Sequence, residues 1–205
     1  ANCREAHGLT PPALAKKTGV LRPGTICAHG VHFTDDDVAL VLESGAGVAL
    51  NPESNLKLAS GIPDIAGLLA AGVPLGLGTD GAASNNRLSM LGELQMAALL
   101  AKLESLEATA LSATAALEVA TLGGARALGL EATIGSIETG KAADLIALDL
   151  SQPHSQPLNN IVSQIVYASN GTELTHSWVA GQPLVRDGKP LTLAPAEISA
   201  RVARW

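Results

Sequence analysis

The stretch GVALNPESNLKLASGIPDIAGLLAAGVPLGLGTD, residues 47–80, contains two short apolar runs separated by a longer segment. The runs, residues 47–50 and 74–78, are short, rich in aliphatic residues and bounded by proline, glycine and polar residues, which is typical of buried strands. Between them, a proline near the start and a glycine after the end bracket a helix over residues 64–71. The stretch therefore predicts a strand, a helix and a second, parallel strand.

The residues on either side extend the same pattern. Residues 25–29 predict an earlier strand, and Thr34 is a candidate N-cap because three aspartates follow it in the first turn of a helix. Further helices are predicted at residues 11–18 and 88–103. Two architectures contain one helix followed by three strand-helix units: an open doubly wound sheet and a part of a (βα)8 barrel.

The pattern changes in the second half of the chain. Two short helices separated by Gly123-Gly124 are predicted over residues 112–128, and a small antiparallel β module with a final helix follows. We place the boundary between residues 1–130 and residues 131–205. The predicted strands of the β module are residues 143–148, 161–167, 177–179 and 183–185, and the final helix is residues 195–204.

Composition excludes several classes of protein. The chain has 205 residues, of which 47% are hydrophobic, 16% charged and 2% aromatic, so it has enough aliphatic material for a core. A net charge of −6 without a basic run argues against a nucleic-acid partner. No apolar run approaches the roughly 20 residues of a membrane span. We expect a cytoplasmic protein, with Cys3 and Cys27 free and Cys27 an inert core thiol.

A polar residue follows each of the three predicted parallel strands: His29, Asn51 and Asp80. Strand carboxyl ends converge on one mouth in a barrel, so residues far apart in sequence can share a site there. Taken singly, each has a simpler interpretation. His29 could be a hydrogen-bonded core histidine, and Asp80 could be a turn or cap residue within Gly78-Thr79-Asp80-Gly81.

Four longer motifs favour the shared site. AHGVH at 28–32, NPESNLKLASG at 51–61 and GTDGAASNN at 78–86 resemble the amidohydrolase superfamily, in particular its methylthioadenosine and S-adenosylhomocysteine deaminases. GSIETGKAADLIALDL at 135–150 is similar to the element by which that superfamily enters its small β-sandwich. The resemblance implies an α/β fold: strands six to eight of a TIM-like (βα)8 barrel, followed by a β-sandwich module.

The resemblance also implies catalytic roles. Asp80 matches the aspartate that ligates a divalent metal, zinc or iron, and accepts a proton from the bound water. A carboxylate oxygen suits such a metal, which lowers the pKa of its water toward neutrality. His29 matches the histidine that orients and polarises this water.

Residues in the neighbouring loops are candidate substrate contacts. They are Asn51, Glu53, Ser84 and His32. Each again has a simpler interpretation. The sequence after residue 50 predicts a proline-initiated turn, whose polar side chains could bond their own backbone. The polar side chains that follow Asp80 could do the same. His32, three residues beyond His29, could cap or brace its loop instead.

Part of the family's metal site has no counterpart in the sequence. The family carries a His-x-His pair on its first strand, a metal histidine on its fifth and a glutamate three positions later, whereas this chain has no His-x-His and no His-x-x-Glu. We therefore expect a C-terminal part whose N-terminal half is absent, starting internally at Ala1. Such a part is expected to be inactive alone, to need that half as its partner, and to work in a homo-oligomer.

The expected activity of the complete enzyme is hydrolytic deamination of a cyclic amidine, cleaving a C–N bond of an adenine-type nucleoside with release of ammonia. Guanine, a pterin or an s-triazine are alternative substrates, since the same hydroxide could displace ammonia or chloride. A noncatalytic binding module that kept the scaffold without the metal histidines is the alternative from another class.

Overall fold

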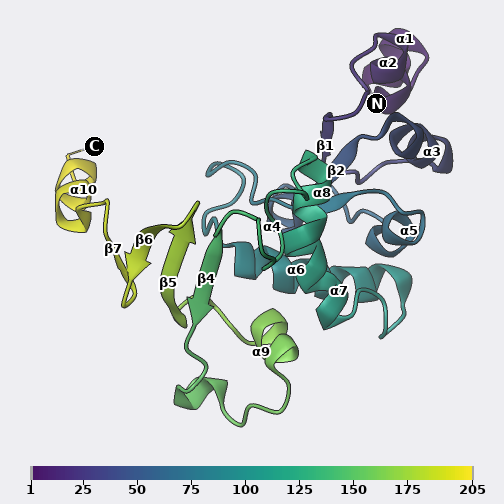
Figure 1. The fold of residues 1–205 in the computed structure, drawn as a ribbon. Coiled ribbons are helices and arrows are strands. Elements are labelled where there is room, and N and C mark those ends of the chain that lie inside the picture. Colours follow the sequence, from purple (N-terminus) through teal and green to yellow (C-terminus); the bar gives the residue numbers. More distant parts are fainter. Residues whose placement is uncertain (1, 205) are drawn as a thin grey trace.

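A three-stranded parallel sheet organises the first part of the molecule in the computed structural model, which describes residues 2–204 (Figure 1). Its strands are β1 (Ile26–Ala28), β2 (Gly47–Leu50) and β3 (Leu75–Leu77), in the order β1-β2-β3. All three predicted parallel strands are thus confirmed, and so is the mixed α/β class. Closure of the sheet into a barrel stays a prediction.

Local sequence signals explain the helix between β1 and β2. In α3 (Asp35–Ser44), the Thr34 side chain accepts a hydrogen bond from the Asp37 backbone, and the Asp37 carboxylate accepts one from the Thr34 backbone. This reciprocal capping box satisfies two donors at the start of the helix. Gly45 ends the helix in the left-handed conformation, with φ of 69°.

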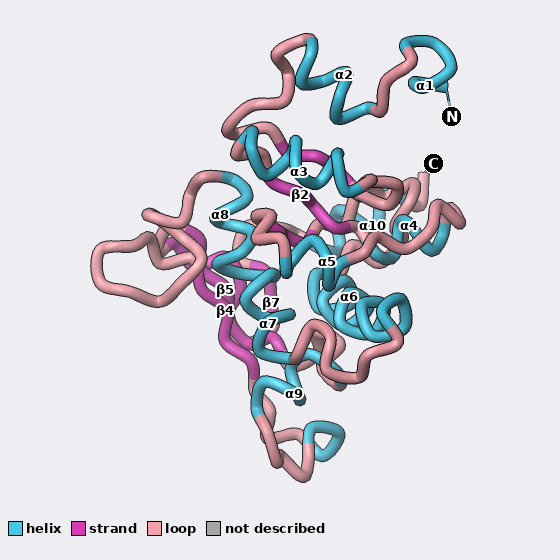
Figure 2. The backbone as a smooth tube through the Cα atoms, turned by 90° about the vertical axis from the view of Figure 1, so that its right-hand side faces the viewer, coloured by secondary structure: helices cyan, strands magenta, loops and turns pink. Residues whose placement is uncertain are grey.

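Of the other helices of the first part, the two that precede β1 lie beyond α3, away from the sheet, and the rest lie closer to it (Figure 2). Those preceding β1 and following β2 and β3 are α1 (Asn2–His7), α2 (Pro11–Lys17), α4 (Pro52–Lys57), α5 (Ile65–Ala70) and α6 (Met90–Ser105). The proline-initiated turn considered as an alternative for the loop after residue 50 is instead the start of α4. Proline at its first position and Glu53 in its first turn are both favourable to a helix N-terminus, so the proline begins a helix here.

Residues 113–128 form a continuous helical run, contrary to the predicted break at Gly123-Gly124. The run comprises α7 (Ala113–Glu118), a π-helical turn (Val119–Gly123) and α8 (Gly124–Leu128). The glycines serve close packing on the sheet: a Cβ at Gly123 would lie 2.6 Å from the Leu75 carbonyl oxygen, and one at Gly76 would lie 2.9 Å from the Gly124 Cα. They permit contact with β3 and do not end the helix.

The core is aliphatic and centred on β2. Val41, Val48, Leu50 and Ile65 are completely buried between the sheet and its helices. β1 is more open, with Ile26 37% exposed. Cys27 is half-buried in this strand, and burial raises the pKa of its thiol, in keeping with an inert thiol.

A four-stranded antiparallel sheet forms the second part. Its strands are β4 (Leu145–Leu148), β5 (Leu174–Val179), β6 (Gln182–Arg186) and β7 (Lys189–Pro190), paired in chain order, which confirms the predicted hairpin across Ala180-Gly181. The described residues provide one such layer, and the sandwich stays a prediction. The short helix η2 (Pro153–Ser155) follows β4, and α10 (Pro195–Val202) is the predicted final helix (Figure 1).

The prediction of a strand at residues 161–167 is wrong, because these residues form α9 (Ile161–Tyr167). Asn160 caps the helix by accepting a hydrogen bond from the Ser163 backbone, and Val166 is completely buried. The helix packs on α6 and α7, away from its neighbours in sequence, and the Gln95 side chain donates to the Tyr167 carbonyl at 2.5 Å (Figure 2). A short apolar run fits either a strand or a helix, and tertiary packing decided for the helix.

Among residues 2–204, none of the helices has both the length and the apolar character needed to cross a membrane.

Candidate functional site

The carboxyl ends of the parallel strands bring the three strand-end residues to one edge of the sheet. His29 directly follows β1, Asn51 directly follows β2, and Asp80 lies three residues after β3. His29 and Asp80 both adopt left-handed backbone conformations, with φ of 71° and 59°. Such conformations cost a non-glycine residue about 1–3 kcal/mol and are common at functional sites, so two at one sheet edge mark a candidate site.

The Asp80 carboxylate receives three hydrogen bonds. Its Oδ2 accepts from the hydroxyls of Ser54 and Ser84, each at 2.7 Å, and its Oδ1 accepts from the Gly81 backbone at 2.8 Å. These bonds, that from Ser54 first, lower the pKa of Asp80 to about 2. Its side chain is therefore an exposed, ionised carboxylate near neutral pH.

His29 is held by the residue that follows Ser54 on α4. Its Nδ1 lies 2.8 Å from Oδ1 of Asn55, whose side chain is buried, and its backbone N–H donates to the Ala49 carbonyl at 2.8 Å. His29 also contributes to the lowered pKa of Asp80, so the two groups lie within electrostatic reach. Ser54 and Asn55 are neighbours on α4, and this one helical turn thus contacts both candidate catalytic groups.

The loop after Asp80 is fastened to α4. The Lys57 ammonium donates to the Ala83 carbonyl at 2.8 Å and to the Asn86 side chain at 2.7 Å. Arg87 forms an ion pair with Glu53. Each end of α4 therefore holds part of the segment that follows the candidate metal ligand.

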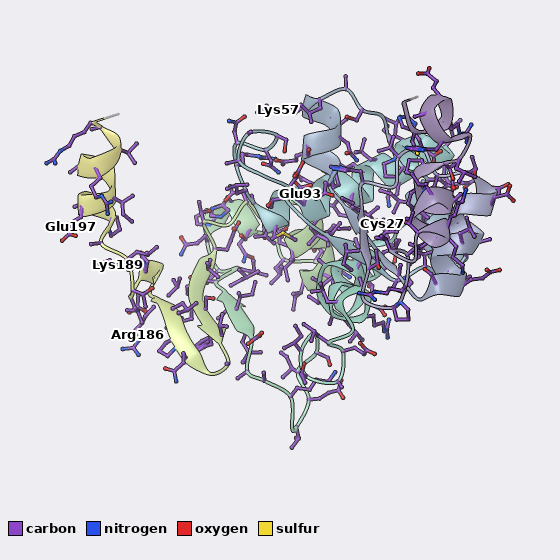
Figure 3. All side chains as sticks on the ribbon, turned by 90° about the horizontal axis from the view of Figure 1, so that it is seen from above. Cys27, Lys57, Glu93, Arg186, Lys189 and Glu197 are labelled. Carbon is purple, nitrogen blue, oxygen red and sulfur yellow. The ribbon has the colours of Figure 1, made fainter. Side chains whose placement is uncertain are left out.

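Glu93 on α6 bonds both α4 and the loop after Asp80. This role was not predicted from the sequence. Its carboxylate is completely buried, accepting hydrogen bonds from the Asn85 amide and, at 3.1 Å, from the Glu53 backbone. Burial raises the pKa of this carboxyl. Figure 3 shows Glu93 and Lys57 in the same region of the molecule, far from Arg186, Lys189 and Glu197. The sequence did contain a signal for this role. Glu93 is an acidic residue in a mainly apolar part of a helix, and a buried charge requires hydrogen-bonding partners.

The candidate substrate contacts have different surroundings. Ser84 bonds Asp80 directly, and Glu53 is engaged by Arg87. Asn51 is buried, with its side-chain oxygen lacking a hydrogen-bond partner among residues 2–204. His32 is exposed and, together with His29, lines a mainly apolar cavity of about 320 Å³.

The donor set on this chain suits one position of a metal site. Residues 2–204 contain no cluster of three or more His, Cys, Asp and Glu side chains arranged to hold a metal ion. Asp80 offers an ionised carboxylate, which is a good ligand for a divalent cation. Catalytic zinc normally takes about three protein ligands, so Asp80 fits as one member of a larger set.

Comparisons with known proteins extend over nearly the whole chain. Residues 1–184 match the model of the amidohydrolase family. A 5-methylthioadenosine/S-adenosylhomocysteine deaminase of Moorella thermoacetica is 48% identical over 198 residues, covering 97% of this chain and 46% of the relative.

Two solved structures share the fold. An adenosine deaminase from Xanthomonas campestris with bound zinc superimposes with a TM-score of 0.96 at 42% identity, covering 100% of this chain and 46% of that one. An atrazine chlorohydrolase from Arthrobacter aurescens in complex with zinc has a TM-score of 0.91 at 26% identity, covering 98% and 45%. The chain thus spans about half the length of the relatives it matches.

Proposed function

Because the chain belongs to the amidohydrolase family, we propose that it contributes part of the active site of a metal-dependent deaminase. The substrates would be adenine-type nucleosides, namely methylthioadenosine, S-adenosylhomocysteine and adenosine, with release of ammonia. The observation that carries the proposal is the ionised Asp80 carboxylate, held by three hydrogen bonds at the same sheet edge as His29.

Asp80 would hold a divalent cation, zinc or iron, through a carboxylate oxygen. When bound, such a cation acts as a Lewis acid and lowers the pKa of a coordinated water. Asp80 and His29 would together take up the proton that this water loses, and His29 would orient the water toward the amine-bearing carbon of the purine. The water oxygen would bond to that carbon, the C–N bond would break, and the proton would pass to the amine, which leaves as ammonia. The ordered hydrogen bonds of both residues support these roles, since positioned groups need no rearrangement during the reaction.

The other metal ligands would come from outside this chain. One carboxylate is too few for a catalytic zinc site, and the relatives are about twice as long as the part matched here. We place the remaining ligands in the portion of the family's length that the chain does not span. An active enzyme would require that portion as its partner.

The two parts of the chain would have distinct places in this enzyme. We assign residues 1–130 to strands six to eight of a (βα)8 barrel, and residues 131–205 to a β-sandwich module with α10. The parallel order β1-β2-β3 and the antiparallel order β4-β5-β6-β7 support this assignment. The position of α9 on α6 and α7 adds a helix from the second segment to the first.

The substrate would lie at the sheet edge, beside the loops that follow β1, β2 and β3. Asn51, Ser84 and His32 are the candidate contacts in these loops, and Glu53 would shape the pocket through Arg87. The unpartnered oxygen of Asn51 supports a ligand contact, because a buried acceptor without a hydrogen bond is costly.

An activity panel tests the proposal. The protein, expressed as its gene encodes it and loaded with zinc, should release ammonia from methylthioadenosine, S-adenosylhomocysteine or adenosine. D80N should lower kcat/KM at least about 100-fold and reduce bound zinc. D36N, in the exposed first turn of α3, is the matched control and should retain both.

Two results would contradict the proposal. Turnover of guanine, a pterin or an s-triazine in place of the nucleosides would assign a different substrate. Absence of hydrolysis across the whole panel, with a folded protein, would favour a noncatalytic binding module.

A further inference from the structure

The contact between His29 and Asn55 determines where the imidazole carries its proton. The His29 Nδ1 and the Asn55 Oδ1 are 2.8 Å apart. An amide oxygen can only accept a hydrogen bond, so the hydrogen must be on Nδ1. In the neutral ring, Nε2 then has a free lone pair.

The backbones of both partners of this bond are held by their surroundings. The left-handed backbone of His29 and its N–H bond to Ala49 set the direction in which the side chain leaves the strand. Asn55 is 2% exposed, its backbone N–H donates to Asn51 at 3.0 Å, and its carbonyl accepts from Ser60 at 2.9 Å. These bonds hold the Asn55 backbone, and the side-chain oxygen is directed to the ring while Nδ2 has no hydrogen-bond partner among residues 2–204.

We propose that Asn55 is a positioning residue that holds His29 as the Nδ1–H tautomer and directs the Nε2 lone pair into the active site. The inference deepens the proposed function and rests on it for its catalytic meaning. A histidine that must orient a water or take up its proton needs an unprotonated nitrogen facing that water. Neutral histidine in water favours the proton on Nε2, so the protein has to supply the opposite preference.

The reverse orientation of the amide would have a different chemical outcome. Were the Asn55 Nδ2 turned toward the ring, Nδ1 would have to accept, and Nε2 would carry the proton. His29 could then take up no further proton without losing the bond. With the oxygen turned toward it, the bond persists both before and after Nε2 is protonated. Only this orientation suits a group that receives and returns a proton.

NMR of the protein as its gene encodes it, labelled with 15N-histidine, gives a direct test. Long-range 1H–15N spectra distinguish a protonated ring nitrogen from an unprotonated one. The His29 signals are assigned by their loss in H29Q, and the remaining histidine signals are internal references. At a pH where the ring is neutral, we expect Nδ1 to be protonated and Nε2 unprotonated.

Two variants separate positioning from simple packing. N55L removes the acceptor while keeping a side chain branched at Cγ, and should shift His29 toward the Nε2–H tautomer. N55D keeps an acceptor oxygen and should retain the Nδ1–H tautomer. In the zinc-loaded protein, N55L should lower kcat by about 10- to 100-fold, with a smaller effect on KM, and N55D should recover part of that loss.

The inference and the proposed function can fail separately. An Nε2–H tautomer in the wild-type protein or in N55D, or an unchanged tautomer in a folded N55L, would overturn the role of Asn55, whatever the activity. If the spectra behave as expected but no nucleoside is deaminated, the tautomer assignment stands and the proposed function fails. Circular dichroism of each variant verifies folding, and N55D provides the test should N55L not fold.

Discussion

Asp80 combines solvent exposure with a strongly lowered pKa, and hydrogen bonding accounts for this combination. Exposed carboxylates usually keep their ordinary pKa, because water solvates the charge about as well as the protein does. Here two serine hydroxyls and one backbone N–H favour the ionised form. The side chain is thereby kept unprotonated and fixed in direction, two conditions that a metal ligand must satisfy.

Ser84→Ala should raise the pKa of Asp80 from about 2 toward its usual range, because one of the donors to Oδ2 is lost. The folded pKa is below the unfolded one, so the associated stabilisation is present above the unfolded pKa and is lost as pH falls toward about 2. S84A should make this contribution smaller. Titration of the Asp80 carboxyl carbon by NMR measures the shift.

Ser199→Ala, on the exposed face of α10, is the matched control and should leave the Asp80 titration unchanged. An unaltered pKa in S84A would show that the hydroxyl does not favour the ionised form.

Sequence alone was sufficient to predict that His29, Asn51 and Asp80 share a sheet edge, since the periodicity of parallel strands determines where their ends lie. It could not predict the contacts that hold them. Those of Ser54 and Asn55 depend on α4, and that of Glu93 depends on how α6 packs beneath it. Such partners are set by three-dimensional packing and leave little periodic signal.

At the scale of elements, α4 is a short helix that acts as a clamp. It contacts His29 and Asp80 near its middle, and its two ends hold the loop of residues 81–87 through Glu53 and Lys57. The helix buries Pro52, Ser54 and Asn55 and exposes Leu56 and Lys57. Its contribution to the fold is thus mainly the ordering of the site.

Lys57→Met should loosen this loop with little effect on overall stability. The ammonium is exposed and bonds two oxygens of the loop, so its loss should increase amide hydrogen exchange at residues 82–86 and lower the free energy of unfolding by less than about 1 kcal/mol. Exchange measured by mass spectrometry checks this.

Lys17→Met, at the exposed end of α2, is the control for removing a surface lysine. If exchange at residues 82–86 is the same in K57M, in K17M and in the wild type, Lys57 does not order the loop.

The packing of α8 on the parallel sheet depends on glycine. A Cβ at Gly47 would lie 2.7 Å from the Ala127 Cβ and 2.8 Å from its carbonyl oxygen. Gly47→Ala should therefore push β2 and α8 apart and lower the free energy of unfolding by about 1–3 kcal/mol. Chemical denaturation measures the change.

Gly81→Ala is the matched control, because a Cβ there meets no atom within 4 Å and the backbone is not left-handed. Equal stability losses in G47A and G81A would show that contact with α8 is not the cause.

Prediction of the elements succeeded where capping and periodicity agreed and failed where they did not. α3 has a capping box and a terminal glycine, and its position was predicted closely. Residues 161–167 are an apolar run too short to distinguish a strand from a helix, and burial against α6 and α7 decided the outcome. The glycines of the α7–α8 run were misinterpreted because close packing and helix termination both favour glycine.

At the scale of the whole molecule, the described part of the chain has much apolar surface. Ile137 is 87% exposed, Leu106 85% and Leu103 63%, and β1 and β3 each pair with β2 alone. Open strand edges and apolar patches favour association with other chains. This agrees with the proposal that the active enzyme includes a further portion.

The 205-residue chain expressed by itself should therefore be poorly stable and should bind zinc in less than stoichiometric amounts. Asp80 and His29 together give at most two ligands, fewer than a catalytic zinc site normally uses. Sedimentation, a thermal melt and metal analysis of the purified chain test this. A soluble monomer that melts cooperatively and holds one zinc per chain would contradict both the proposed partner and the ligand assignment.

Family membership was predicted from four motifs and confirmed by a match over residues 1–184. Closure of the barrel and pairing of the second sheet into a sandwich stay predictions. Both depend on contacts between distant surfaces, and a local sequence pattern specifies only which face of each strand is apolar.

The position of α9 has a consequence for how such a protein can be recombined. Along the chain, α9 lies between β4 and β5, yet it packs on α6 and α7, whereas β4 pairs with β5. In a chimera of two relatives, a crossover between α8 and β4 would pack α9 of one parent on α6 and α7 of the other. A crossover between α9 and β5 would pair β4 of one parent with β5 of the other. No single crossover between α7 and β5 keeps both interfaces within one parent. The segment from α6 to β5 is therefore expected to function best when it comes from one parent. Chimeras between relatives should take both sides of each interface from the same protein.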